Sequence, residues 1–369
     1  MLGERIRFAR EAAGLRQADV AEKLGISESG VCDIERSKRE LKASHLSVLA
    51  GLFHRSMDFF FSDEPLRADF VLWRCKPEDQ DQALRLQRRF LELCEDYRAL
   101  EDLLGCPKPP LLPAAQKPRG QYSYGDAESL AMDAWMRLRL GDTPAEALQR
   151  VLEEDYSVRV FALEMGDLAS ASCALNDRLG ACMLLNIDST SWRRNFDMAH
   201  ELFHLLTWSI FRTPDDEVSD VASSLEESLA NVFASRLLLP EAPFGQRLHR
   251  TTAGGRPLTV GDVHELAREF NVSAEAVIYR IAGLSRWPKE RTVEAVERTK
   301  ASYPGRESRP IGCLPERYVV LTERAYRQGL ISFARAAKYL RMGFKKAQSI
   351  LEPPEDVSNL DSPLETANR

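Results

Sequence analysis

The motif that most constrains this chain is His-Glu-Leu-Phe-His at residues 200–204, an H-E-x-x-H pattern. On a helix, two histidines four residues apart project from the same face, so their imidazoles can converge on one metal ion. Glu201 lies on the same turn and can reach a metal-bound water without being a ligand, as a hydrolytic general base must. The neighbouring residues are mostly apolar, which predicts a buried helix whose polar side chains need compensation. The alternative is a chance match on a core helix.

A second helical pattern downstream supplies a candidate third ligand. Residues 225–240 carry apolar side chains at helical spacing and end at Pro240. Glu227 falls on the edge of the apolar face, whereas Glu226 is expected to point about 100° away and to be solvated. Two histidines and a glutamate, with water in the fourth position, form a catalytic rather than a structural zinc site. This ligand set suits Zn²⁺ best but also admits Mn²⁺.

Together the two motifs resemble those of the ImmA/IrrE metallopeptidases. The matching stretches are A-H-E-L-F-H-L-L at 199–206 and E-S-L-A-N-V-F-A-S-R-L-L-L-P at 227–240. In that family the glutamate four residues before the asparagine is a metal ligand, which implies His200, His204 and Glu227 as ligands and Glu201 as the catalytic residue. The resemblance extends from about residue 125 to about residue 285.

The peptidase region, assigned to residues 121–245, is expected to have a zincin-like fold. Helices are predicted over residues 127–140 and 144–155, followed by short strands over 158–163, 171–175 and 181–187. Strands followed by a metal-binding helix indicate a small mixed sheet above that helix. Its edge strand could pair with an extended peptide and hold a scissile bond over the metal.

Residues 1–65 predict a separate domain of five short helices. Gly25 ends the second helix and Ser27 caps the third, which gives a helix-turn-helix arrangement. The stretch from Leu2 to Arg39 resembles the Xre/Cro-type DNA-binding domain. The resemblance implies DNA contacts from residues near phosphate, facing base edges, or in the basic segment that follows: Gln17, Glu28, Ser29, Asp33, Arg36, Lys38 and Arg39.

The acidic residues Glu28 and Asp33 on the expected reading face depart from a simple DNA-binding surface. Carboxylates can accept from cytosine N4, but they weaken non-specific attraction to DNA. A helical module for dimerisation or protein contact is therefore the alternative for this domain. The net charge of −6 likewise argues against indiscriminate nucleic-acid binding by the whole surface, without excluding a local patch.

The remaining segments predict mostly helix, so the whole chain is assigned to the mainly α class with a small mixed β-sheet (α+β). Residues 66–120 combine a strand-like piece at 69–74, a long helix over 77–104 and a proline-rich linker; the helix could pair with a second copy or pack on the peptidase core. Residues 246–300 predict a helix-turn-helix-like subdomain with Ser273 as a cap. Residues 301–352 predict a helical segment rich in Arg and Lys, with helices over 325–332 and 334–340, and residues 353–369 a disordered tail.

A cytoplasmic protein is expected. The seven cysteines are scattered and contain no C-x-x-C pair, which favours reduced thiols. The N-terminus has no apolar signal core, and no apolar run approaches the roughly eighteen residues of a membrane span.

Two functions remain open on the sequence. Members of the ImmA/IrrE family cleave Xre-type repressors, which implies a DNA-binding metallopeptidase acting on such a repressor in a stress, mobile-element or defence response. The alternative is an Xre-family transcriptional regulator whose peptidase-like domain senses a ligand or binds a partner without turnover. The intact H-E-x-x-H motif favours the first, because a regulator without catalysis has no need of Glu201.

The acidic stretch 211–226 is interpreted as a solvated loop rather than a substrate-selecting rim.

Overall fold

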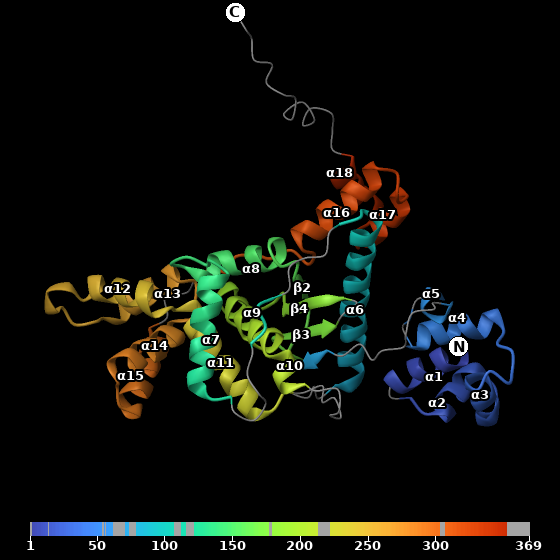
Figure 1. The fold of residues 1–369 in the computed structure, drawn as a ribbon, viewed down its shortest axis with the longest axis horizontal. Helices are drawn as coiled ribbons and strands as arrows, with labels where there is room; N and C mark the ends of the chain where they lie inside the picture. Colours follow the sequence, from blue (N-terminus) through green and yellow to red (C-terminus); the bar gives the residue numbers. More distant parts are fainter. Residues whose placement is uncertain are drawn as a thin grey trace, which may run out of the picture. The chain divides into compact units, whose positions relative to one another are not determined.

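The computed structural model divides the chain into two compact units (Figure 1). One comprises Met1–Phe70 and Asp79–Leu91, and the other comprises Val71–Glu78 and Glu92–Arg369. The structure describes residues 2–13, 15–53, 55, 57–61, 71–73, 79–106, 112–115, 122–176, 179–212, 222–302 and 307–352. Most of the expected proline-rich linker, the acidic stretch from 213 to 221 and the expected tail from 353 onward lie outside these ranges.

The first unit contains the five expected helices. They are α1 (Leu2–Ala12), α2 (Gln17–Leu24), α3 (Glu28–Glu35), α4 (Ala43–Phe53) and α5 (Met57–Phe61). Gly25 ends α2 in the left-handed region at φ 64°, where the absence of a Cβ removes the steric penalty. The Ser27 side chain accepts from the backbone N–H of Gly30, so both predicted helix signals are confirmed.

A buried ion pair joins the helices of this unit beside its apolar core. Arg10 donates to the two carboxylate oxygens of Glu35 at 2.5 and 3.1 Å, and the Gln17 amide donates to Glu35 at 2.7 Å. The apolar core of the same unit includes the fully buried side chains Val20 and Leu49. Since one carboxylate is satisfied by three donors, the pair specifies how α1, α2 and α3 pack.

The second unit is built on a four-stranded mixed sheet in the order β1-β3-β4-β2. Its strands are β1 (Leu72–Trp73), β2 (Arg159–Leu163), β3 (Ala171–Asn176) and β4 (Gly180–Asn186). The last two pair as an antiparallel hairpin, and β2 lies parallel to β4. The expected mixed sheet is thus confirmed, but β1 pairs with β3 at Ser172 and Cys173, so the β3 edge is not free there.

Helices cover the sheet on the side of the H-E-x-x-H motif. They are α7 (Tyr124–Arg137), α8 (Pro144–Glu154), α9 (Ser191–Leu206), α10 (Trp208–Phe211) and α11 (Ser224–Leu238). Figure 1 shows α9 beside β3 and β4, with α11 packed between α9 and α7. Phe203 on α9 and Phe233 on α11 are fully buried with ring centroids 5.6 Å apart. The motif helix therefore lies in the core, as its apolar neighbours predict.

The rest of the second unit is helical, as expected, but its elements differ in detail from the prediction. They are α6 (Gln80–Leu103, shared with the first unit), α12 (Glu241–Thr251), η1 (Ala253–Gly255), α13 (Val260–Glu269), α14 (Ala274–Ser285), α15 (Lys289–Ala301), α16 (Glu316–Arg327), α17 (Phe333–Tyr339) and α18 (Phe344–Leu351). The helix predicted over 325–332 is wrong, because α16 ends at Arg327 and Gly329 adopts a φ of 69°. A left-handed residue cannot continue a right-handed helix.

A buried ionic cluster ties α6, β2 and α16 together. The Glu101 carboxylate, 2% exposed, accepts from Arg159 and from Arg317, each at 2.5 Å. Arg317 also donates to the Tyr97 hydroxyl at 2.9 Å. One acid thus compensates two guanidinium groups that come from distant parts of the sequence, so its removal would leave buried positive charge without a partner.

A second buried acid, Glu153 on α8, makes stability depend on pH. Burial, which Glu316 and Glu154 reinforce, raises its pKa from 4.5 to about 7 despite a hydrogen bond from Gln149. Because the folded-state pKa exceeds the unfolded one, this group stabilises the fold fully below about pH 4.5. That contribution disappears as pH rises through about 7.

We expect Glu153→Gln to stabilise the chain by up to about 3 kcal/mol near pH 8 and to change little near pH 4. Urea denaturation midpoints of the wild type and the variant at both pH values measure the difference. Glu154→Gln is the matched control, since its side chain is 56% exposed. A gain independent of pH would contradict the assignment.

Candidate metal centre

Hydrogen bonds at the start of α9 hold the motif helix against the sheet. Arg194 donates to the backbone carbonyls of Ile187, at 3.2 Å, and of Arg309. Arg193 pairs with Asp197 one turn later at 3.1 Å. These contacts anchor the helix before its apolar part begins, so the side chains of the next two turns have defined positions.

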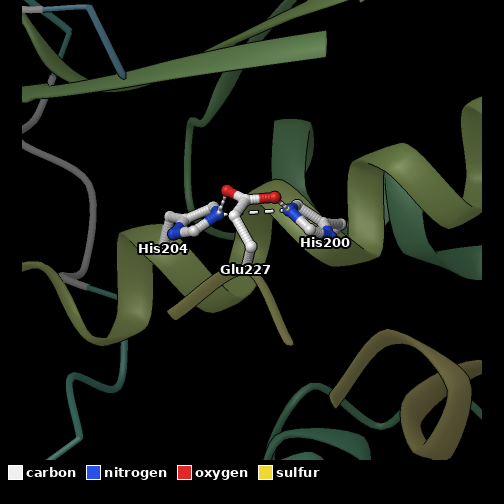
Figure 2. A group of neighbouring side chains, drawn as sticks. All are labelled: His200, His204 and Glu227. Atoms are coloured by element: carbon white, nitrogen blue, oxygen red, sulfur yellow. Dashed lines mark hydrogen bonds and ion pairs between the residues drawn. The ribbon is translucent and has the colours of Figure 1, made fainter. Parts of the chain in front are cut away.

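The structure brings His200, His204 and Glu227 together at one point between α9 and α11 (Figure 2). Their ligand atoms all lie within 4.8 Å of one another. The Glu227 oxygens lie 3.2 Å from His200 Nε2 and 3.3 Å from His204 Nε2, and the two Nε2 atoms are 3.2 Å apart. Ligand atoms each about 2.0–2.1 Å from a tetrahedral zinc ion would lie about 3.3–3.4 Å apart, so the spacing fits such an ion.

The far nitrogen of each histidine has its own partner on α11. Asn231 Oδ1 lies 3.1 Å from His200 Nδ1, and Glu226 Oε1 lies 2.7 Å from His204 Nδ1. An oxygen at each Nδ1 favours the tautomer that carries its proton there, which turns both Nε2 lone pairs toward the common point. Outer partners of this kind orient metal-binding histidines and raise their basicity.

The prediction that Glu226 is solvated is wrong. It is 3% exposed, and besides His204 it contacts Arg212, whose Nη1 donates at 2.8 Å. The angular argument considered α11 alone, but His204 of α9 and Arg212, which follows α10, both contact Glu226. An adjacent carboxylate can therefore reach the back of a histidine whose front faces Glu227.

Sequence reasoning also missed Asn231 and Arg212. A signal for the first is present: Glu227 and Asn231 are four residues apart and share one helix face, like the two histidines opposite them. No spacing signal exists for Arg212, because its contact depends on how the chain turns after α9.

The electrostatics of this centre favour a bound cation. Burial opposes a negative charge on Glu227, yet hydrogen bonds with His200 and His204 lower the pKa of this carboxyl to about 2. Burial likewise opposes protonation of His204, but Glu226, Glu227 and Glu201 together raise its pKa to about 9. Three buried or half-buried carboxylates surround the site, so a divalent cation at the ligand atoms would balance their charge.

Glu201 is 2% exposed and lies on the turn that carries His200. Its neighbour across the sheet interface is Cys173 on β3, whose pKa is raised by burial and further by the Glu201 carboxylate. A carboxylate beside the ligand histidines and beneath the sheet is positioned to exchange a proton with a group held near the ligands.

The residues expected to contact DNA lie in the first unit and are of two kinds. Glu28, Ser29 and Asp33 are exposed on α3, and Arg36, Lys38 and Arg39 are exposed just after it. Gln17 begins α2 but is half-buried, and its side-chain amide donates a hydrogen bond to the Glu35 carboxylate. The first six are therefore accessible to a ligand, whereas Gln17 also serves the packing of its own domain.

Two other histidines and a tyrosine, side chains of the type that can stabilise an oxyanion, are not carried by the helices that form the metal centre. His249, His264 and Tyr279 lie on α12, α13 and α14. His264 is buried and Tyr279 is 52% exposed.

None of the helices in the described ranges combines the length and the apolar character that a membrane span requires.

Two family models match the chain. Residues 153–282 match the IrrE N-terminal-like domain, and residues 6–60 match a helix-turn-helix model. The first match contains every residue of the metal centre, and the second contains α2 and α3.

Two characterised proteins are similar over different lengths. The propionyl-CoA carboxylase regulator of Cereibacter sphaeroides is 24% identical over 77% of this chain and 65% of its own length. The radiation response metalloprotease IrrE of Deinococcus radiodurans is 32% identical over 27% of this chain and 30% of its own length. The chain thus spans less than two thirds of either relative. Among solved structures, a Mycobacterium tuberculosis transcriptional regulator matches 51% of each chain at 18% identity with a TM-score of 0.32.

Proposed function

We propose that this chain is a DNA-binding, metal-dependent endopeptidase, because residues 153–282 match the IrrE N-terminal-like domain and residues 6–60 match a helix-turn-helix model. Its substrate class would be an Xre-type repressor or a related regulatory protein. The observation that carries the proposal is the meeting of His200, His204 and Glu227 beside the buried Glu201.

His200, His204 and Glu227 would hold the metal, with Zn²⁺ favoured over Mn²⁺ by the two imidazoles. When bound, the ion supplies Lewis acidity and lowers the pKa of a coordinated water. Asn231 and Glu226 keep the histidine lone pairs directed at the ion, and Arg212 keeps Glu226 charged. The catalytic residue would be Glu201, which takes a proton from the attacking water and passes it to the leaving amine.

The helix-turn-helix domain would place the peptidase near DNA-bound regulators. Binding of the chain and of its substrate to neighbouring DNA sites would raise the effective concentration of one for the other. The substrate would be either a separate repressor or another copy of this chain. Cleavage of a repressor would relieve repression in a stress, mobile-element or defence response.

The test is a cleavage assay with the zinc-loaded full chain and purified Xre-type repressors from the same genome. Mass spectrometry would detect new termini in the repressor or in the chain itself. We expect Glu201→Gln to retain metal but to reduce cleavage by about 10²–10⁴-fold, the usual contribution of a general base. Equal cleavage by this variant would exclude the assigned role of Glu201.

The second candidate is a transcriptional regulator in which the metal centre binds a ligand or partner without turnover. Similarity to a protein described as a regulator over 77% of this chain supports it. Full metal occupancy together with no cleavage of any repressor, with and without single-stranded or double-stranded DNA, would favour this candidate over the peptidase.

A further inference from the structure

A helix-turn-helix turn that combines one residue pattern with one pair of closing backbone hydrogen bonds occurs three times in the described part of this chain. The turn at Arg286-Trp287-Pro288 has the residue pattern but not both bonds, because Arg286 donates to the carbonyl four residues earlier. A left-handed residue, an apolar residue and the N-cap of the next helix follow one another at Gly25-Ile26-Ser27, Asn271-Val272-Ser273 and Arg341-Met342-Gly343. The left-handed residues have φ of 64°, 49° and 53°. The second and third turns thus repeat the geometry of the N-terminal motif.

The backbone hydrogen bonds of the three turns also correspond. Ile26, Val272 and Met342 each donate to the carbonyl five residues earlier, at 3.1, 3.0 and 3.2 Å. Each preceding left-handed residue donates to the carbonyl three residues before it, at 3.3, 3.2 and 3.1 Å. This pair of bonds closes the end of the first helix and sets the direction of the second.

The last copy, α17–turn–α18, has a complete supporting core. Ala336, Leu340 and Ala347 are buried at the positions that Val20, Leu24 and Val31 occupy in the N-terminal motif. A third helix, α16, packs on both helices of the pair, as α1 does on α3. Its buried Tyr318 donates a hydrogen bond to the Tyr339 carbonyl at 3.1 Å. The three C-terminal helices therefore form a trihelical unit of the DNA-binding type.

The three copies differ in charge. Across the nineteen residues from 17 to 35 there are five acidic and one basic residue, and across 263–281 there are three acidic and two basic. Across 333–351 there are five basic residues and no acidic one. A chain of net charge −6 thus places an uninterrupted positive charge on its last helix pair.

The second helix of the last copy presents an accessible polar face. Lys345, Lys346, Gln348 and Ser349 are all exposed, and their spacing places them on one side of α18. We call these four residues the α18 face. The corresponding helix of the middle copy, α14, packs against α11 and α15, and its Arg280 is buried.

We propose that the trihelical unit α16–α18 binds double-stranded DNA, with the α18 face in the major groove. Lys345 and Lys346 neutralise phosphates or donate to guanine, and Gln348 can donate to and accept from adenine. Arg335 and Lys338, exposed on α17, would contact the adjacent backbone. The remaining basic residue, Arg341, pairs with Asp96 of α6 at 2.9 Å and belongs to the packing of the unit.

Duplex DNA is favoured over duplex RNA by groove geometry. The major groove of B-form DNA admits an α-helix, whereas that of A-form RNA is too deep and narrow for side chains to read. A protein partner is the other class that such a face could contact, because Phe344 at the start of α18 is 67% exposed. Its ring lies 4.5 Å from that of Phe333, which holds it beside rather than on the α18 face.

The test measures fluorescence anisotropy of a labelled mixed-sequence duplex about three helical turns long, at several salt concentrations. The full chain carries Arg36→Ala, Lys38→Ala and Arg39→Ala, which weaken the N-terminal domain as a DNA ligand. Into this background we introduce Lys345→Ala with Lys346→Ala. The matched control removes two exposed basic residues from α15, Lys289→Ala with Arg298→Ala.

We expect the background chain to bind the duplex and the α15 control to bind it equally. The α18 variant should bind at least about tenfold more weakly, and the slope of log affinity against log salt should fall by about 1.8. No binding by the background chain, equal loss in both variants, or preference for duplex RNA would overturn the proposal. Circular dichroism of each variant tests for unfolding. Because Lys345 and Lys346 are both exposed, we expect the spectra of the variants to match that of the background chain.

Discussion

Replacing Glu227 with alanine is expected to abolish stoichiometric zinc binding. The variant loses the carboxylate whose two oxygens lie 3.2 and 3.3 Å from the histidine Nε2 atoms. Outer partners of metal ligands typically contribute 10–100-fold to affinity, so loss of a ligand should cost more than about 100-fold. Metal content of the dialysed protein and competition with a chelator measure the change.

Two further variants on the same helix are expected to show a smaller loss of zinc affinity and no loss, respectively. Glu226→Gln keeps the shape beside His204 but removes the charge, so we expect affinity to fall by about 10–100-fold. Leu225→Ala, whose side chain is 50% exposed, should leave metal binding unchanged. If Glu227→Ala retained wild-type affinity while Glu226→Gln did not, Glu226 would be the ligand in its place.

Glu101→Gln should be the most destabilising single change outside the metal centre. The substitution leaves Arg159 and Arg317 close to a neutral amide in a buried site. Removing one partner of a buried ion pair costs about 3–5 kcal/mol, which for a domain of this size lowers the melting temperature by roughly 6–20 °C. Differential scanning calorimetry of the full chain measures the shift.

The matched control is Glu146→Gln, which breaks the exposed ion pair with Arg309 at 3.8 Å. Exposed pairs contribute at most about 1 kcal/mol, so this variant should melt within a few degrees of the wild type. Similar melting temperatures for the two variants would show that Glu101 does not hold α6, β2 and α16 together.

The sequence predicts well those features that depend on neighbouring residues. Gly25 and Ser27 carry their turn and cap wherever the helices pack, and the spacing of His200 and His204 alone places them on one face of a helix. Glu227 could be selected because the apolar periodicity of its helix defines which side faces the core. Each of these features depends on local geometry. The helix-turn-helix fold and the convergence of His200, His204 and Glu227 could therefore be predicted from the sequence.

Contacts between elements distant in sequence could not be predicted in the same way. Glu226 was expected in solvent because nothing in its own helix indicates that Arg212 and His204 surround it. The pairing of β1 with β3 joins residues about a hundred positions apart, and the Glu101 cluster joins three segments. Periodicity reports which side of an element is buried but not which partner buries it.

The short strand β1 determines where the second unit can be separated from the helix-turn-helix domain. Val71 and Leu72 are each 1% exposed, and they belong to the second unit although they precede α6. A fragment that starts at α6 would lose this strand, and the backbone of β3 at Ser172 and Cys173 would become an open edge. Open edges recruit strands from other molecules. An expression boundary upstream of Val71 should therefore keep this edge paired, whereas a boundary downstream of Trp73 should give a fragment that is more prone to aggregate through it.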